Sequence, residues 1–470
     1  MRSRPDYVEL HCHSAFSFLD GTALPHELAE AAERLGHTAL ALTDHDSVSG
    51  SMEHAQAAED GGVRAIHGAE VTLDDGRHLT LLVRDRRGWR NLCRVLTEAH
   101  ARTRVYGEGR TARRSERPAL ALATLLDHAE GLVCLSGCAR RGVHDEPTLR
   151  RLRDAFGPGA LRVELQRPFE RDDRARNRRL EALARRLGVA TVATGDVHAH
   201  TPARARLQDA FVAIREHTTL DASEPLRRAN HAHVLTTPAA MAARFADHPE
   251  AVAETARLAE TLEFDLTRDL GYRYPGEEDE TADLTLATIC FDFLEQRYPR
   301  DSSRRARARA RLEDELRVIR GLGLSGFFLL HHEILEMARD VATEVRGRTG
   351  SAARRALPPG RGRGSSVSSI VCHLTGLSHV DPIEHELELG SFHSEDLTSL
   401  PDIDLDFPRD VRAVLIPRVH ERYGKDRAAL VAAFPTFKAR GSIRELGKVL
   451  GLPPGEIERV ARGSEMWGKN

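Results

Sequence analysis

Nine potential metal ligands recur through the first 200 residues, nearly all where an apolar, strand-like run ends. They are His11, His13, Asp20, His45, Glu70, His100, Cys138, Asp196 and His198. Scattered His, Asp and Glu side chains are usually surface residues, so such regular placement constrains the fold. An α/β barrel gathers the ends of distant strands on one face. The pattern therefore predicts a metal centre at one end of a barrel.

Seven short apolar runs have the composition of β-strands. They cover residues 7–13, 38–44, 63–71, 79–84, 131–137, 160–166 and 190–198. Most gaps between the runs carry helical patterns, such as residues 24–35, 48–58 and 174–187. This alternation predicts a parallel sheet that is covered on both faces. We favour a closed barrel, because an open doubly wound sheet, the alternative, would not gather so many strand ends around one point.

Length and composition set the frame for the rest of the chain. At 470 residues, two or three domains are expected. No apolar stretch approaches the roughly 20 residues that span a bilayer, and the polar start is no signal peptide. The six cysteines form no CxxC pair, which favours a reduced cytoplasm. A net charge of −3 gives no argument for a nucleic-acid partner.

The composition changes after the predicted barrel. Residues 199–265 have a mostly helical pattern, and the polar stretch 267–283 is the best candidate for a domain boundary. A long helix rich in Arg and Ala is predicted at about 284–320. The predicted domains are residues 1–270, 271–430 and 431–470.

The candidate ligands in the first domain suit a cluster of metal ions. Residues i and i+2 of a strand face the same way, so His11 and His13 can bind together, as can Asp196 and His198. Imidazole and carboxylate ligands suit Zn²⁺, Mn²⁺ or Fe²⁺. Nine ligands exceed the need of one ion, so a site for two or three ions is predicted. The alternative is that several of these histidines are surface or helix-end residues.

A second candidate site lies in residues 401–407, where acidic and apolar residues alternate. As a strand, this segment places Asp402, Asp404 and Asp406 on one face. Carboxylates held close together favour a bound cation, and hard oxygen ligands suit Mg²⁺. The alternative is an acidic edge strand with an ordinary core face.

A Gly-rich segment, residues 360–366, precedes this acidic run. It leads into a helix-like stretch, whose first backbone N–H groups would suit a triphosphate, with Arg and Ser nearby. Taken alone, a Gly/Arg-rich run is commonly a flexible linker.

The motifs of the first domain resemble the polymerase-and-histidinol-phosphatase (PHP) domain over roughly residues 6–270. The resemblance rests on HCH (11–13), the DG of FLDG (20–21), TDHD (43–46), GAE (68–70), EAH (98–100), SGC (136–138) and GDVH (195–198). It implies a distorted seven-stranded α/β barrel that carries up to three metals, with the nine residues above as ligands. The implied activity is phosphoester hydrolysis, which in a polymerase would be 3′→5′ exonuclease action.

The second region resembles the palm of bacterial C-family replicative polymerases, closest to the error-prone branch. The resemblance rests on GRGRGSS (360–366), LTGLSHVDPIEHELELGSF (374–392) and LPDIDLDF (400–407). It implies a mixed α+β partial palm followed by the start of a helical thumb. The implied roles are as follows: Asp402 and Asp404 would be catalytic carboxylates with Mg²⁺, Arg363, Gly364 and Ser365 would hold the triphosphate, and Lys438 and Arg440 would contact phosphates near the primer.

The sequence departs from the polymerase pattern in its third catalytic aspartate. After Asp406 only Asp410 and Asp426 follow, and neither has the expected context. Fingers and clamp-binding regions are also missing, so polymerisation by this chain alone should be slow or absent.

Three hypotheses follow from these motifs. The first is part of a C-family DNA polymerase that acts on a DNA primer–template and dNTPs. The second is a metal-dependent exonuclease or phosphoesterase whose palm remnant only binds DNA. The third is a non-catalytic half of a split polymerase, completed by a second polypeptide that carries the fingers.

Overall fold

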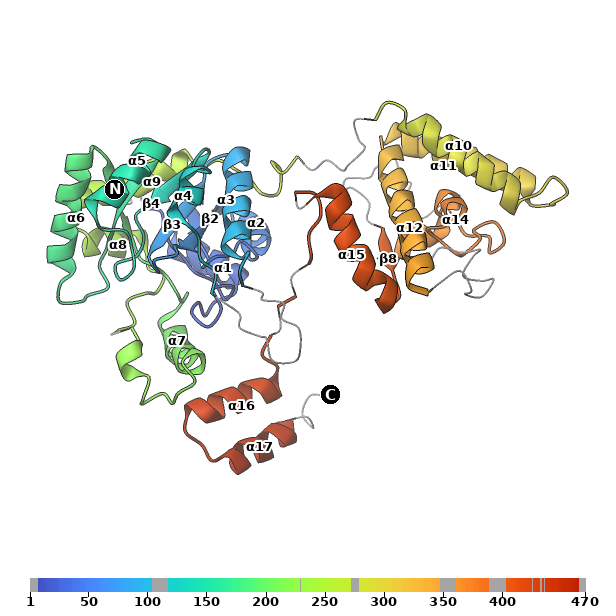
Figure 1. Ribbon diagram of the computed structural model, residues 1–470. Helices are drawn as coiled ribbons and strands as arrows, with labels where there is room; N and C mark the ends of the chain where they lie inside the picture. Colours follow the sequence, from blue (N-terminus) through green and yellow to red (C-terminus); the bar gives the residue numbers. More distant parts are fainter. Residues whose placement is uncertain are drawn as a thin grey trace. The chain divides into compact units, whose positions relative to one another are not determined.

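The computed structural model describes the backbone in nine segments: residues 7–103, 117–228, 230–271, 279–346, 361–388, 403–424, 426–431, 433–434 and 436–464. The chain forms two compact units, each of which is described by itself. The first comprises residues 1–271 together with 436–470, and the second comprises residues 272–435. Figure 1 labels the elements of both units.

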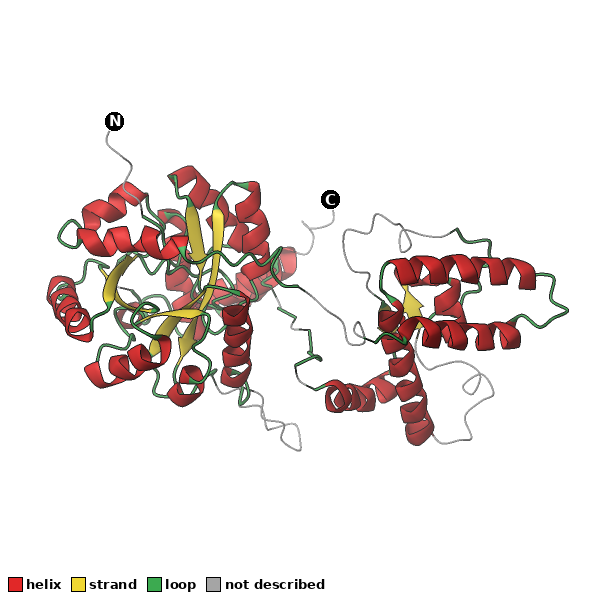
Figure 2. Cartoon of the chain, turned by 90° about the horizontal axis from the view of Figure 1, so that it is seen from above, coloured by secondary structure: helices red, strands yellow, loops and turns green. Residues whose placement is uncertain are grey.

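A six-stranded sheet forms the centre of the first unit, and its spatial order follows the sequence. The strands are β1 (Ala39–Leu42), β2 (Arg64–Thr72), β3 (His78–Val83), β4 (Leu132–Leu135), β5 (Leu161–Gln166) and β6 (Ala190–Thr194). Figure 2 shows the curled strands with helices around them. All residues of β1, β3 and β4 are buried, which agrees with the near-continuous apolar runs of the sequence.

The prediction of an all-parallel sheet is wrong at β3, which runs antiparallel to both β2 and β4. The other three pairings, β1–β2, β4–β5 and β5–β6, are parallel. Only residues 73–77 connect β2 to β3, and such a short link cannot hold the crossover that parallel neighbours need. One consequence is that the first residue of β3, His78, lies opposite Thr72 at the carboxyl end of β2.

The first apolar run, residues 7–13, joins the two edges of this sheet. Isolated parallel bridges pair Glu9 with Leu40 of β1 and Cys12 with Val197, just beyond β6. The His13 N–H donates to the carbonyl of Val197 at 2.7 Å, and the Val197 N–H donates to that of His11 at 2.9 Å. Six of the seven predicted runs are thus strands, and the seventh closes the curled sheet through single bridges.

Helices surround the sheet. They are α1 (Pro25–Leu35), α2 (Ser51–Asp60), α3 (Arg86–Ala99), α4 (Leu122–Leu126), α5 (Glu146–Phe156), α6 (Asp173–Leu187), α7 (Pro202–Arg215), the 3₁₀ turn η1 (Glu224–Leu226), α8 (Pro238–Arg244) and α9 (Pro249–Glu260). In α3, the Asp85 carboxylate caps the first turn by accepting from the Gly88 N–H. Its apolar residues Leu92, Val95 and Leu96 recur at helical spacing and are buried in the core. The helical patterns at 24–35, 48–58 and 174–187 are confirmed by α1, α2 and α6.

Two further helices, α16 (Ala439–Val449) and α17 (Pro454–Gly463), belong to the same compact unit. The Leu220 N–H, beyond the end of α7, donates to the carbonyl of Val449 at 2.8 Å. These helices lie in residues 431–470, the segment predicted to be the start of a thumb.

The second unit consists of helices α10 (Ala282–Arg297), α11 (Arg305–Gly321), α12 (Ser325–Arg346), α14 (Ile370–Thr375) and α15 (Arg409–Tyr423), the 3₁₀ turn η2 (Gly364–Ser368) and the short strands β7 (Arg361–Arg363) and β8 (Asp404–Asp406). The prediction of one long helix at 284–320 is wrong, since α10 ends at Arg297 and α11 begins at Arg305. Pro299 lies in the break, where it cannot supply the N–H that a continuous helix requires. Among the helices of the described segments, none is long and apolar enough to cross a membrane.

A buried carboxylate organises the segment that follows the Gly-rich run. Glu315 of α11 is fully buried and accepts from the N–H groups of Ile370 and Val371 at 3.0 and 3.2 Å. It also accepts from the Ser369 hydroxyl at 2.8 Å and pairs with Arg311 at 2.9 Å. A side chain distant in sequence therefore caps the first turn of α14.

Candidate metal centre

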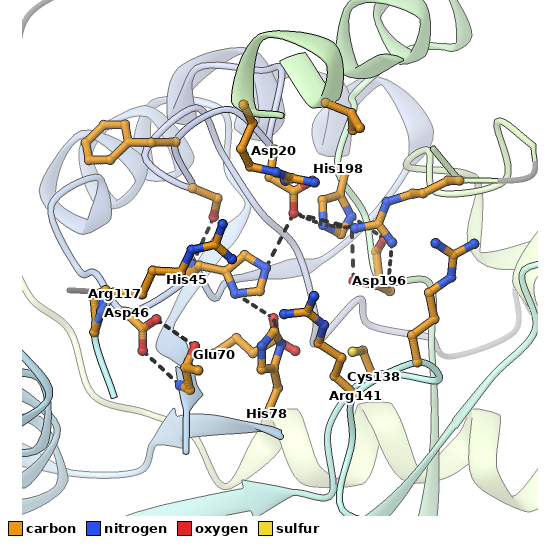
Figure 3. Close-up of a pocket in the computed structure, with 18 of the residues that line it drawn as sticks. Asp20, His45, Asp46, Glu70, His78, Arg117, Cys138, Arg141, Asp196 and His198 are labelled. Carbon is orange, nitrogen blue, oxygen red and sulfur yellow. Dashed lines mark hydrogen bonds and ion pairs between the residues drawn. The ribbon is translucent and has the colours of Figure 1, made fainter. Parts of the chain in front are cut away.

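The candidate ligands converge at one end of the curled sheet. His11 and His13 lie on the closing segment, His45 follows β1 and forms a parallel bridge with Glu70 of β2, and Asp196 and His198 follow β6. Figure 3 shows His45, Glu70, Asp196 and His198 around one pocket with Asp20 and Cys138. The strand ends thus bring residues that are far apart in the sequence to one place.

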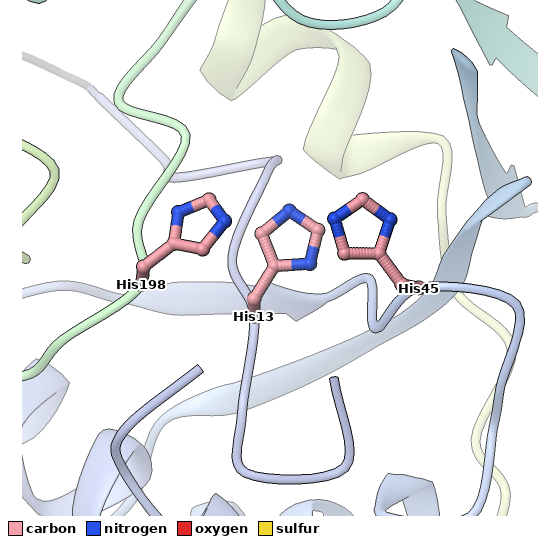
Figure 4. Close-up of side chains that lie close together, drawn as sticks. All are labelled: His13, His45 and His198. Atoms are coloured by element: carbon pink, nitrogen blue, oxygen red, sulfur yellow. The ribbon is translucent and has the colours of Figure 1, made fainter. Parts of the chain in front are cut away.

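Three imidazoles form the middle of the cluster. The ring of His13 lies between those of His45 and His198, with centroid separations of 4.5 and 4.3 Å (Figure 4). One ligand atom of each of these residues lies within 4.8 Å of those of the other two. Burial holds the pKa of His13 well below its ordinary value, so its ring is neutral and keeps a lone pair for a ligand bond.

Glu70 and Asp196 place carboxylates beside these rings. The Glu70 Oε2 atom is 2.9 Å from His45 Nδ1 and 3.7 Å from His13 Nε2. The Asp196 Oδ1 atom is 3.5 Å from His13 Nε2 and 3.7 Å from His11 Nε2. Although burial opposes it, neighbouring imidazoles hold the pKa of Glu70 well below its ordinary value, and His198 and Arg228 do the same for Asp196. Both carboxylates are therefore ionised and suited to a cation.

Two nitrogens of the cluster test whether the residues fit metal ions. Nε2 of His11 and Nε2 of His13 are buried and make no hydrogen bond within the described segments. Buried polar atoms are normally hydrogen-bonded, so such an orphaned pair needs another partner. An ion between these nitrogens and the ionised carboxylates would supply it, and the donor set of imidazole and carboxylate suits Zn²⁺, Mn²⁺ and Fe²⁺ alike.

Asp20 reaches the cluster from a tight loop. Its Oδ2 atom is 3.1 Å from His198 Nε2 and 3.4 Å from His45 Nε2. The next residue is Gly21, where an added Cβ would lie 1.9 Å from the carbonyl oxygen of Ser14. Only glycine therefore fits at position 21, and this lets the tight loop carry the Asp20 carboxylate to the cluster.

The remaining two predicted ligands differ in position. Cys138 lines the pocket, and burial together with Glu70 and Asp196 raises the pKa of its thiol. His100, like Asp20 and Cys138, lies outside the four groups of ligand atoms within 4.8 Å, and unlike them it does not line the pocket. Its ring is exposed, and its Nε2 atom is 2.8 Å from the carbonyl oxygen of Asp46.

Two histidines that sequence reasoning missed lie in the cluster. His78 Nδ1 is 3.4 Å from Glu70 Oε2, and His233 Nδ1 is 3.2 Å from Asp196 Oδ2. Most predicted ligands lie where an apolar run ends, whereas His78 precedes its run and reaches the cluster because β3 is antiparallel to β2. A search that also took residues before short hairpin strands would have found it. His233 belongs to no run, and no motif marked it.

A buried carboxylate orients His11 from behind. Glu164 of β5 lies 2.7 Å from His11 Nδ1 and accepts from Gln166 Nε2 at 2.8 Å and from the Thr194 hydroxyl. A carboxylate on the far nitrogen fixes the tautomer and points the other nitrogen, Nε2, at the site. The arrangement is that of a metal-ligating histidine with its supporting partner.

Arginines line the pocket, whose volume is about 370 Å³. Its lining includes Arg117, Arg140, Arg141, Arg215 and Arg228. Anionic and imidazole ligands below a rim of guanidinium groups suit a phosphate ester, because the rim attracts the phosphate that the ions would clamp.

The candidate polymerase residues of the second unit lie on a two-stranded antiparallel ladder. Arg363 of β7 is the register partner of Asp404 of β8, and its Nε atom is 2.9 Å from Asp406 Oδ2. Gly364 follows β7 with φ +70°, a conformation that favours glycine. Asp402 and the side chain of Ser365 lie outside the described part of the chain.

The last two candidate residues lie in the first unit. Lys438 directly precedes α16, and Arg440 in its first turn pairs with Glu458 of α17 at 3.5 Å. They are therefore on a different compact unit from Arg363 and Asp404.

Comparison with known proteins finds two family models along the chain, and the second of them crosses the division between the two compact units. A family model described as the PHP domain matches residues 9–168, and one described as the bacterial DNA polymerase III alpha NTPase domain matches residues 284–469. The curled sheet with its cluster of ligands is thus a PHP domain. The two matches assign the chain a PHP domain followed by a domain of the DNA polymerase III alpha type.

Its relatives include error-prone DNA polymerases. That of Symbiobacterium thermophilum is 34% identical over 476 residues, which cover 97% of this chain and 42% of the relative. That of Mycobacterium tuberculosis strain H37Rv is 35% identical over 486 residues, with coverages of 98% and 42%. The chain therefore spans less than half the length of these relatives. Among solved structures, an amidohydrolase from Chromobacterium violaceum covers 41% of this chain and 87% of its own, at 21% identity and a TM-score of 0.30.

Proposed function

We propose that the barrel is a metal-dependent phosphoesterase that removes nucleotides from the 3′ end of DNA. The observation that carries this proposal is the overlap of ligand groups: His13, His45 and His198 share members with groups built on Glu70 and on Asp196, all below an arginine rim. Such overlap supports two or three ions of Zn²⁺, Mn²⁺ or Fe²⁺ held close together. His11, His13, Asp20, His45, Glu70, Cys138, Asp196 and His198 are the proposed ligands, with His100 carried over from the family and His78 and His233 added by geometry.

Bound ions would supply Lewis acidity and a nucleophile active at neutral pH. The chain's own residues do the rest. The arginine rim binds and orients the phosphate, while Glu164 holds the Nε2 atom of His11 directed at the site. The depth of Glu70 and Asp196, both almost fully buried, limits access of bulk water.

For the second unit we propose a nucleotide-binding role as part of a polymerase site with Mg²⁺, in which Asp402 and Asp404 bind metal and Arg363, Gly364 and Ser365 hold the triphosphate. The facing positions of Arg363 and Asp404 support it, because a carboxylate–metal pair and a cationic phosphate ligand must lie side by side. Lys438 and Arg440 are proposed to contact DNA phosphates.

One assay tests both roles: the purified chain with a labelled primer–template, Mn²⁺ and Mg²⁺, with and without dNTPs. We expect the primer to shorten, His13→Ala to abolish shortening, and Asp404→Ala to leave it intact. Equal loss in both variants would contradict a separate nuclease site in the barrel. Lengthening of the primer would show that the chain holds a complete polymerase site.

A further inference from the structure

Arg228 contacts three of the proposed ligands at once. Its Nη2 atom is 2.6 Å from His198 Nε2 and 3.5 Å from Asp20 Oδ2, while its Nη1 atom is 3.3 Å from Asp196 Oδ2. Only 17% of its side chain is exposed. The guanidinium therefore lies among the atoms that would ligate one of the ions, rather than only at the rim of the pocket.

The hydrogen bond to His198 shows that Arg228 binds the lone pair of one ring nitrogen, Nε2. Nδ1 of His198 is 2.8 Å from the carbonyl oxygen of Asp196, an acceptor, so this nitrogen carries the ring proton. With this tautomer Nε2 accepts from an Arg228 N–H, and the Asp20 carboxylate, 3.1 Å from the same nitrogen, pairs with the guanidinium. A metal ion would need this same lone pair, and one lone pair cannot serve both.

The charge of Arg228 also prevents it and a metal ion from binding these ligands at the same time. An arginine in a protein stays protonated, and it cannot release its charge when an ion arrives. A guanidinium and a divalent cation on the same two carboxylates would repel each other at contact distance. Either Arg228 holds these three ligands or an ion does.

We propose that Arg228 is a built-in competitor for the metal position formed by Asp20, Asp196 and His198. Its guanidinium and a divalent ion alternate at these three side chains, so that this position binds its ion more weakly than the one formed around His11, His13 and Glu70. The inference rests on the proposed metal centre and adds unequal occupancy of its positions.

The test is calorimetric titration of the full chain, freed of metal, with Mn²⁺. Arg228→Met removes charge and donors while keeping much of the length of the side chain. We expect this variant to bind one more Mn²⁺ than the wild type, or to bind the weakest one more tightly by on the order of tenfold, a typical coupling between competing sites. Arg228→Gln, a second neutral variant, gives the same test should the methionine variant not fold.

Arg204→Met is the matched control. Arg204 lies in the same compact unit but outside the lining of the pocket and pairs with Glu27 at 2.7 Å, so its loss should leave the Mn²⁺ titration unchanged. One outcome overturns the inference but leaves the metal centre standing. In it, both Arg228 variants bind Mn²⁺ no more tightly than the wild type does, while the wild type still binds Mn²⁺ more tightly than His13→Ala does. Binding in the wild type no stronger than in His13→Ala overturns the metal centre, and the inference with it.

Discussion

Glu164 acts on the proposed metal centre through a single imidazole, and this makes its contribution measurable. Its carboxylate faces His11 Nδ1, while the opposite nitrogen of that ring faces Glu70 and Asp196. We expect Glu164→Gln to weaken Mn²⁺ binding by roughly 10- to 100-fold, since loss of such a supporting partner typically has that effect. Calorimetric titration with Mn²⁺ measures it.

Glu254→Gln is the control for this change. Glu254 is also buried, but it pairs with Arg162 at 2.7 Å and contacts no proposed ligand. Two outcomes would contradict the supporting role of Glu164. In one, Glu164→Gln binds Mn²⁺ as tightly as the wild type does; in the other, the affinity for Mn²⁺ falls equally in Glu164→Gln and Glu254→Gln.

At the residue scale, sequence reasoning found the ligands whose position follows from strand direction. His11, His13, Asp196 and His198 alternate along extended segments, and the structure brings them together. Arg228 could not be found this way, because its contacts depend on the path of an irregular loop. Glu164 was hidden for a different reason: it sits inside an apolar strand, where the sequence alone cannot tell a buried supporting carboxylate from any other acidic residue.

At the element scale, the length of the connection between two strands decides the direction of the second strand, which the pattern of apolar residues does not. Apolar runs predicted six of the strands, but run composition does not encode direction, and the five-residue link before β3 reverses it. Likewise, one long helix was expected at 284–320, but the turn residues 298–304, which include Pro299, separate α10 from α11. Short links and single prolines deserve as much weight as periodicity in a chain of this kind.

The cap on α14 gives a prediction for one element. Glu315→Gln removes the charge that binds the N–H groups of Ile370 and Val371 and that neutralises Arg311. Losing a charged acceptor destabilises by about 1.5–3 kcal/mol. We therefore expect the amide protons of α14 to exchange at least roughly tenfold faster, as measured by hydrogen–deuterium exchange on the full chain.

Glu313→Gln provides the comparison on the same helix. Glu313 is half exposed and pairs only with the neighbouring turn, at Arg309. Its substitution should leave exchange in α14 unchanged. Equal exchange in both variants and the wild type would show that the neutral amide caps the helix as well as the carboxylate does.

At the scale of the whole molecule, buried histidines away from the metal centre make the barrel sensitive to acid. Burial, with His54 next in effect, lowers the pKa of His67 to about 3, and burial also lowers the pKa values of His37 and His54. In the unfolded chain these rings take up protons near pH 6.5, whereas the folded barrel keeps them neutral. The unfolded state therefore binds more protons below that pH, and the free energy of unfolding falls as the pH falls.

We expect His67→Gln to flatten this decline by up to about 1.4 kcal/mol per pH unit, the contribution of one proton. Urea unfolding followed by circular dichroism, between about pH 6.5 and 5, measures the slope. His231→Gln, at an exposed ring, should keep the wild-type slope. A slope in His67→Gln as steep as that of the wild type would contradict the assignment.

The domain-level prediction from sequence was coarse. The polar stretch at 267–283 was expected to separate two domains, and the compact units divide between residues 271 and 272. By contrast, α16 and α17 belong to the same unit as the barrel because of contacts such as that between Leu220 and Val449. Local sequence does not predict such contacts. Long-range packing of this kind is invisible to periodicity.

The segment that closes the curled sheet has a consequence for the entropy of the unfolded chain. Residues 7–13 hold the two edges together through single bridges, and they also carry His11 and His13. An ion shared by His13 and His198 would therefore act as a cross-link between parts of the chain that are far apart in sequence. A tie across such a long loop removes more freedom from the unfolded state than a tie between near neighbours does. Metal loading would thus stabilise this barrel as a reversible counterpart of a disulfide.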